Sequence, residues 1–352
     1  MGQTLVRDKD IDRIRGFAMI QVILVHTLYW VGLFDGGCIS IVKSFFLFEM
    51  PLFFFVTGAL NRNRTISAPI KFVFRRMIRV MIPYWVFAAL NISVIVAKSI
   101  WRNTLTLSYI VKAIVSWIIP CDRQYDSFLY STWALWFIPI YIICVALLPL
   151  ALKIHKGKHE KLTVAVLIAF VVLFQQLGFG FLQKVSFYMI WVFLGLHYDF
   201  VRAYLTAKPI WGVLSACCAG LAVLSFCGFS LDMQKNKFPP NIVFLIFSVG
   251  AVTVVLKFIF CNTAFVDKLH QNRVFGYLLH EYEMHSLSIF LYQPIVFYAL
   301  GVLFGIVPPR IGGNDFVMET LYLIFAIPTC AVTGKLFSYF ETIKVGKKTR
   351  SC

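Results

Sequence analysis

The chain has 352 residues, of which 60% are hydrophobic and 14% are charged, and its mean hydropathy is +0.80. Soluble domains carry about 25% charged residues, so this composition excludes an ordinary soluble protein and predicts a polytopic transmembrane bundle of the all-α class. The formal net charge is +17. Because the basic residues cluster between apolar runs, we interpret this charge as the positive-inside bias of a membrane protein, and we expect no nucleic-acid partner.

Ten apolar runs are long enough to cross a bilayer as helices, at about 20 residues for each crossing. We expect the spans at residues 15–34, 43–60, 80–98, 132–152, 162–178, 182–198, 209–228, 241–261, 285–306 and 316–339. Another apolar stretch, 105–119, predicts a short interfacial or re-entrant helix that ends at Pro120. No small-residue cleavage site follows the first run, so we interpret it as a retained span and not as a signal peptide.

Most of the Lys and Arg residues fall on one side of this arrangement, chiefly in the N-terminal segment, the loops 61–79 and 153–161, and the tail. That asymmetry predicts that both termini face the cytosol. We therefore divide the chain into a cytosolic N-terminal segment (1–14), a membrane domain (15–340) and a basic cytosolic tail (341–352).

Arg15 and His26 occupy the first apolar run. They are eleven positions apart, which is three helical turns plus about 20° at about 100° per residue, so both side chains share one face and lie about 16 Å apart. Arg15 is then near the inner surface and His26 near mid-depth, where an ionisable side chain marks a functional site by default. The alternatives are a snorkelling anchor for Arg15 and a hydrogen-bonded packing role for His26.

Glu49 lies at a matching depth on the next span. That span reaches the cytosol near Asn61, so Glu49 is about 18 Å from the inner surface. A carboxylate that faces the imidazole of His26 would orient the ring and fix its tautomer. The alternative is that Glu49 faces an outer vestibule. We predict His26, Arg15 and Glu49 as the catalytic residues.

Three arginines open the third span on its cytosolic side. Arg75 and Arg79 are i,i+4 neighbours on one helix face, and Arg76 lies beside them. Guanidinium groups bind phosphates in a bidentate manner, so these side chains, together with Arg15, predict a clamp for a phosphorylated ligand. The alternative is that they serve only as a topology signal.

Aromatic and polar side chains on two later spans are candidate substrate contacts. Trp133 and Trp136, near the outer end of the fourth span, form either a sugar-stacking platform or part of the aromatic belt at the membrane surface. Tyr292 and Gln293 lie within the ninth span, where the Gln293 amide must find a partner inside the bundle. Plain interhelical hydrogen bonding is the alternative to substrate binding.

Several common catalytic motifs are absent from the sequence. The chain has no Gly-x-Ser-x-Gly elbow, no Walker loop and no His-Glu-x-x-His motif. Its nine cysteines show no metal-ligand spacing, so we expect no metal. Cys38 and Cys121 fall in loops predicted outside, where a disulfide between them is weakly supported.

Motifs along most of the chain resemble those of the acyltransferase-3 family of bacterial membrane proteins. They are Ile11-Asp12-Arg13-Ile14-Arg15-Gly16-Phe17-Ala18 with its spacing to His26, Met50-Pro51-Leu52-Phe53-Phe54-Phe55-Val56-Thr57-Gly58, Arg75-Arg76-x-x-Arg79-x-x-x-Pro83-Tyr84, Leu135-Trp136-Phe137-Ile138, and Ser288-Ile289-Phe290-Leu291-Tyr292-Gln293-Pro294. The second motif is closest to the fucose 4-O-acetylase-like branch. The chain departs from that branch at Glu49, where His is frequent, at Thr57, where Ser is usual, and at Gln293, where His is common.

The resemblance implies a multi-pass protein of the bacterial cytoplasmic membrane that transfers an acyl group, usually acetyl, from cytosolic acyl-CoA to a sugar hydroxyl. In that family the residues matched by Arg15 and His26 are considered essential. The expected partners are acetyl-CoA as acyl donor, a carbohydrate or lipid-linked glycan as acceptor, and the lipid bilayer.

Two functions fit these residues. In the first, the arginines hold the phosphates of acyl-CoA while His26 acts either as general base on the sugar hydroxyl or as a transient acyl carrier. In the second, the protein is a proton-coupled transporter or flippase of a lipid-linked sugar, and His26 and Glu49 form a proton relay.

Overall fold

Helices account for all regular structure in the described part of the chain. The computed structural model describes residues 8–31, 37–121, 134–157, 159–305 and 316–342. The helices are α1 Lys9–Val31, α2 Gly37–Ser44, α3 Glu49–Ala59, α4 Pro69–Trp101, α5 Leu107–Trp117, α6 Phe137–His155, α7 Glu160–Gln176, α8 Gly180–Leu196, α9 Tyr198–Ala207, α10 Trp211–Phe226, α11 Met233–Lys237, α12 Ile242–Cys261, α13 Thr263–Gln271, α14 Arg273–Met284, α15 Ser286–Phe304, α16 Phe316–Phe337 and α17 Tyr339–Thr342.

Seven helical segments of the described residues are long and apolar enough to cross a membrane, or up to eight when α9 and α10, bent by 104°, count as one span. Helices α7 and α8 cover the fifth and sixth predicted spans but have only 17 residues each. Large apolar side chains such as Trp101 (89% exposed) and Phe226 (93%) lie on the outside, as lipid-facing positions should. The all-α membrane bundle is confirmed, whereas the count of about ten spans and the side of the termini stay predictions.

Helix α1 begins at Lys9, earlier than the predicted start at residue 15. Asp10 and Asp12 are buried in its first turn, and each has a basic partner. Asp10 pairs with Arg202 at 2.6 Å, and Asp12 pairs with Arg15 at 2.9 Å. Since pairing offsets the cost of burying a carboxylate, the helix extends through a segment whose charges predicted a separate polar tail.

The second predicted span is broken into two helices. Helix α2 ends at Ser44 and α3 begins at Glu49. The backbone N–H of Met233 donates to the Ser44 hydroxyl at 2.9 Å, and the Gln21 amide donates to the carbonyl of Phe46 at 2.7 Å, so other elements supply hydrogen bonds at the break, as buried backbone requires. The break places Glu49 in the first turn of α3, where the helix dipole favours a carboxylate.

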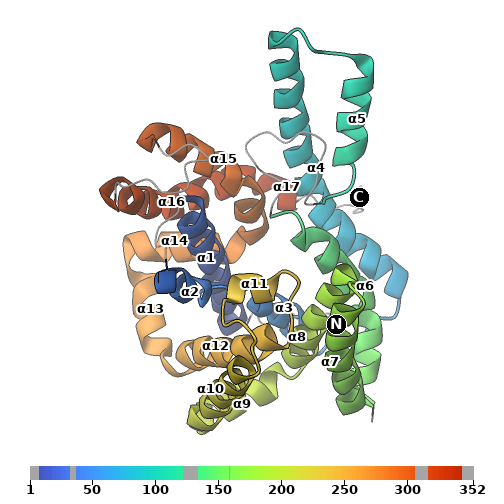
Figure 1. Cartoon of the computed structure of the whole chain (residues 1–352), viewed down its shortest axis with the longest axis vertical. Helices are drawn as coiled ribbons and strands as arrows, with labels where there is room; N and C mark the ends of the chain where they lie inside the picture. The colour runs from blue at the N-terminus through green and yellow to red at the C-terminus, as the bar shows by residue number, and fades with distance from the viewer. Residues whose placement is uncertain (1–7, 32–36, 122–133, 158, 306–315, 343–352) are drawn as a thin grey trace, which may run out of the picture.

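Helices α4 and α5 form a hairpin that projects from the rest of the molecule (Figure 1). Helix α4 has 33 residues and begins with Pro69, a residue suited to the first helical position, so the arginine segment before the predicted third span is itself helical. The expected short helix at 105–119 is α5. Its N-cap is Thr106, whose hydroxyl accepts a hydrogen bond from the N–H of Tyr109 at 3.2 Å.

Helices α3 and α8 lie in backbone contact at two glycines. A Cβ on Gly58 would lie 2.1 Å from the carbonyl oxygen of Val192, and one on Gly195 would lie 2.0 Å from that of Phe55. Small residues allow this close approach, as they do at other helix interfaces in membranes. No other residue type fits at either position without moving the helices apart.

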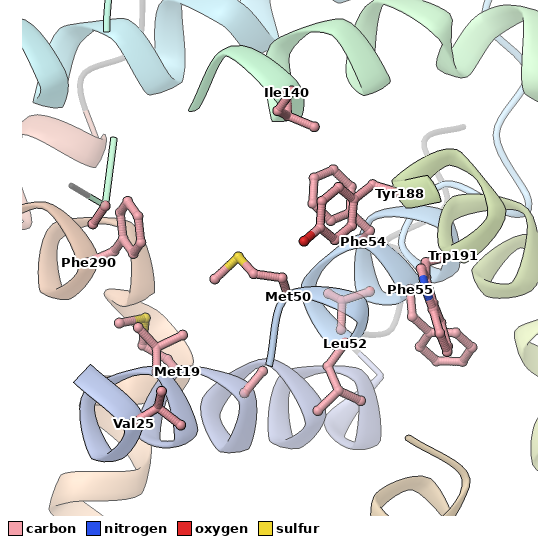
Figure 2. Packing of buried hydrophobic residues seen from close by; sticks show 14 of the residues in the cluster. Met19, Val25, Met50, Leu52, Phe54, Phe55, Ile140, Tyr188, Trp191 and Phe290 are labelled. Atoms are coloured by element: carbon pink, nitrogen blue, oxygen red, sulfur yellow. The ribbon is translucent and has the colours of Figure 1, made fainter. Parts of the chain in front are cut away.

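Aromatic rings fill the interior beside this contact. Phe54 of α3 stacks on Tyr188 of α8 with ring centroids 4.4 Å apart, and Phe137 of α6 meets Phe54 edge-on at 5.6 Å and Phe290 of α15 at 5.4 Å. Figure 2 shows Phe54 and Tyr188 together, with Met50 and Phe290 extending from α3 and α15. Residues of α3, α6 and α15 line two of the cavities described next.

Candidate functional site

Three cavities adjoin one another through shared lining residues. The His26 cavity, of about 580 Å³, is lined by His26, Glu49, Trp136 and Lys237 among others. The Arg15 cavity, of about 190 Å³, shares Met50, Phe137 and Phe290 with it. The Arg75 cavity, of about 710 Å³, shares Arg76 and Arg79 with the Arg15 cavity. The arginines, His26, Glu49 and Trp136 thus line three neighbouring cavities.

His26 is half-buried on α1 and is held by Gln293 of α15. Its Nδ1 lies 2.8 Å from Oε1 of Gln293. The Gln293 Nε2 donates to the carbonyl of Phe290 at 2.9 Å, which turns the amide so that Oε1, an acceptor only, faces the ring. The ring proton is therefore on Nδ1. A neutral His26 then carries its lone pair on Nε2, the atom that a general base uses.

Glu49 forms a buried ion pair with Lys237 of α11 and does not contact His26. The Lys237 ammonium donates to Oε1 of Glu49, and the two side chains are only 3% and 1% exposed. In this structure the residue that holds Nδ1 of His26 is Gln293 and not Glu49, and the catalytic role of Glu49 stays a prediction. The Oε2 of Glu49 is buried and has no hydrogen-bond partner among the described residues, and Glu49 is one of the residues that line the His26 cavity.

Arg15 lines the Arg15 cavity from the first part of α1. Its Nη2 donates to Asp12 at 2.9 Å and also to the backbone carbonyl of Glu283 on α14. Glu283 also packs against Gly16: a Cβ added to Gly16 would lie 2.6 Å from Cγ of Glu283. The guanidinium is thus held by a side chain of its own helix and by the backbone of α14.

The other predicted arginines line the Arg75 cavity, and Arg76 and Arg79 also line the Arg15 cavity. With Arg64 and Lys71, the Arg75 cavity has five basic side chains, and none of its described lining residues is acidic. Such a surface binds phosphate groups through charge-assisted hydrogen bonds. All three arginines line a cavity, and the phosphate clamp stays a prediction.

Trp136 lines the His26 cavity at the start of α6. Its ring contacts Phe238 edge-on at 5.3 Å, and the Lys184 ammonium lies 5.3 Å from the ring centroid. This position supports the stacking platform over the membrane belt. Trp133 lies outside the described residues.

Tyr292 and Gln293 do not line any of the three cavities, so the predicted substrate contacts are not supported for either residue. The ring of Tyr292 stacks on Phe337 of α16 at 3.8 Å and meets Phe87 of α4 edge-on at 5.6 Å. Gln293 is buried and bonds His26. Both side chains of α15 therefore join helices, as the alternative interpretation of the ninth span held.

Two functional contacts were missed in the sequence. The first is the contact of Glu49 with Lys237, which lies in a loop predicted on the outer side of the membrane. A carboxylate inside the bundle requires a basic partner, and this requirement could have indicated a lysine near Glu49. Asp12 was noted only as part of a motif, although its spacing of three from Arg15 favours a pair. Cys121 is a free cysteine, and the side chain of Cys38 lies outside the described residues.

A family model described as an acyltransferase domain matches residues 8–335, which includes α1 and all of the predicted site residues. A search of curated proteins and a search of solved structures each found no match. The match confirms the family expected from the motifs, while the fucose 4-O-acetylase-like branch stays a prediction. The chain therefore belongs to the acyltransferase-3 family, and its helical bundle is that of a membrane acyltransferase.

Proposed function

We propose that this protein is an O-acetyltransferase of the bacterial cytoplasmic membrane that moves an acetyl group from cytosolic acetyl-CoA to a sugar hydroxyl of a cell-surface glycan or its precursor. One observation carries the proposal. The Arg15 cavity and the His26 cavity share three apolar lining side chains, those of Met50, Phe137 and Phe290.

In this proposal acetyl-CoA, the acyl donor, binds in the Arg75 and Arg15 cavities. The five basic side chains of the Arg75 cavity suit the phosphates of CoA. The narrower Arg15 cavity has mostly apolar lining residues, and its charged ones are Arg15, Arg76, Arg79 and Glu341. Its apolar part suits the extended arm that ends in the thioester. Under the positive-inside rule this basic end faces the cytosol, where acyl-CoA is found.

The acceptor occupies the larger His26 cavity. Trp136 offers an apolar ring face for a sugar, because flat sugar faces stack on aromatic rings. The unpartnered Oε2 of Glu49 accepts a hydrogen bond from a second hydroxyl of the sugar, and a buried acceptor without a partner costs about 1–3 kcal/mol. Lys237 offsets the charge of that carboxylate.

His26 acts as general base in this scheme. Its Nε2 takes the hydroxyl proton while the sugar oxygen attacks the thioester carbon. The C–S bond then breaks, and the CoA thiolate takes the proton back from the imidazolium, which leaves an acetyl ester, free CoA thiol and neutral His26. Gln293 keeps the other ring proton on Nδ1 throughout.

The test uses purified protein in lipid nanodiscs with labelled acetyl-CoA and candidate glycans, with CoA thiol release and labelled glycan as readouts. His26→Ala should lower the rate by about 100-fold or more, whereas His280→Ala, at an exposed position of α14, should not. Full acetylation by the His26→Ala protein would overturn the proposal. Sugar flux without acetyl-CoA consumption would favour the transporter.

Donor placement is tested separately. Arg76→Ala with Arg79→Ala should raise KM for acetyl-CoA by about tenfold or more, since a hydrogen bond to a charged group contributes about 1.5–3 kcal/mol. Arg102→Ala, an exposed arginine at the far end of the same helix, is the matched control. An unchanged KM in the double variant would show that CoA phosphates bind elsewhere.

A further inference from the structure

A cluster of three potential metal ligands lies apart from the three cavities. It consists of His155, Glu160 and His197. His155 is in the last turn of α6, Glu160 is the first residue of α7, and His197 caps the C-terminus of α8. The Nδ1 of His155 and the Nε2 of His197 each lie 2.8 Å from the same oxygen, Oε1 of Glu160. The two imidazole rings are nearly perpendicular, with centroids 4.6 Å apart.

We propose that these three residues form a binding site for a divalent transition-metal ion, with Zn²⁺ as the best fit. Their potential ligand atoms all lie within 4.8 Å of one another. Four tetrahedral ligands at about 2.0 Å from Zn²⁺ are about 3.3 Å apart, so small rotations of the side chains bring the three atoms to coordination distance.

The donor set selects the metal. Two imidazole nitrogens and one carboxylate oxygen suit Zn²⁺, whereas Mg²⁺ and Ca²⁺ prefer oxygen ligands only. Binding moves each ring proton to the other nitrogen of its imidazole and replaces two N–H···O contacts with metal bonds. The carboxylate also offsets part of the charge of the ion.

Exposure allows an ion to enter and a water molecule to complete the coordination. The side chains of His155, Glu160 and His197 are 20%, 15% and 42% exposed. None of them lines the acyl-transfer cavities, so the ion has a structural role. It cross-links the α6–α7 turn to the end of α8, and α8 is the helix that contacts α3 at the two glycines.

The experiment uses the full chain purified through a histidine-free tag, treated with a chelator and titrated with Zn²⁺ alone. We expect about one Zn²⁺ per chain by elemental analysis and a higher unfolding midpoint with Zn²⁺ than with Mg²⁺. His155→Ala and His197→Ala should each weaken Zn²⁺ binding by about 100-fold or more, since even partners of metal ligands contribute 10–100-fold. His159→Ala, an exposed residue of the same turn, should bind as the wild type does.

Two results would overturn the proposal: no saturable Zn²⁺ site in the wild-type chain, or equal binding by the wild type, His155→Ala and His197→Ala. X-ray absorption of the wild-type Zn²⁺ complex gives a readout that does not depend on how the variants fold. It should show nitrogen and oxygen ligands with imidazole scattering, and sulfur ligation would assign the metal to cysteines instead. Neither measurement uses acyl transfer, so the outcome is independent of the proposed reaction.

Discussion

The amide oxygen of Gln293 lies 2.8 Å from Nδ1 of His26, although the two residues are 267 positions apart in the chain. Because the Gln293 amide nitrogen donates to the carbonyl of Phe290, its oxygen faces the ring and fixes the proton on Nδ1. The contact joins α1 to α15 and prepares Nε2 for proton transfer. Gln293 is thus a positioning residue for His26.

Replacing Gln293 by Leu should lower kcat by about fivefold with little change in KM for acetyl-CoA. A neutral hydrogen bond contributes about 1 kcal/mol, and 1.4 kcal/mol corresponds to a factor of ten in rate. Gln293→Glu keeps an acceptor oxygen beside Nδ1 and should retain most of the activity. Steady-state kinetics of both variants check this, and equal activity of the Leu variant and the wild type would refute the positioning role.

The ion pair of Glu49 and Lys237 should show strong coupling in a double-mutant cycle. Glu49→Gln or Lys237→Met alone leaves one buried charge without its partner, which costs about 3–5 kcal/mol. The double variant removes both charges and should recover much of that loss. Thermal unfolding in detergent measures the four proteins, and the prediction fails when the two single losses simply add.

The wall between the His26 and Arg15 cavities should influence acyl-chain selection. Phe290→Leu enlarges the space at the shared wall, so the ratio of kcat/KM for propionyl-CoA to that for acetyl-CoA should rise by about tenfold, since one methylene is worth about 1–3 kcal/mol in a pocket. Phe297→Leu, a buried position of the same helix outside the cavities, is the control. A ratio that changes equally in both variants would contradict the assignment.

Gly195→Ala should destabilise the protein by about 1–3 kcal/mol or more, because the added methyl overlaps the carbonyl of Phe55 and forces α3 and α8 apart. Gly212→Ala places the same group on α10 with no atom within 4 Å and should stabilise by up to about 1 kcal/mol. Thermal unfolding measures the midpoint of each variant relative to the wild type. Similar shifts in both variants would argue against the close helix contact.

The sequence predicted the helices well because apolar runs of membrane length mark them directly. It was less accurate where charges pair across the chain. Helix α1 begins before the predicted span, and Arg202, one of the two described ion-pair partners of its buried Asp10, is connected to it by no local pattern. The break before Glu49 involves hydrogen bonds from Gln21 and Met233, which lie 25 and 189 positions from their partners.

The candidate site shows the same pattern: single residues were predicted from the sequence, whereas contacts between distant residues were not. The arginines and His26 were found because single residues at defined depths carry their own signal in a membrane. The partner of His26 could not be chosen between Glu49 and Gln293 by depth, since depth gives height along the membrane normal and leaves the direction of a side chain open. Only the packing of α15 against α1 decides that choice.

The close contact of α3 and α8 at Gly58 and Gly195 bears on which step limits the rate of turnover. We expect this backbone contact to limit movement of α3 against α8, so in the proposed reaction Met50 of α3 is the stationary side of the wall between the donor and acceptor cavities. Passage of a thioester end past that wall then relies on turning the rings of Phe137 and Phe290. Side-chain rotation is faster than the microsecond-to-millisecond motion of whole helices, and we expect turnover to be limited by the chemical step or by product release and not by opening of the bundle.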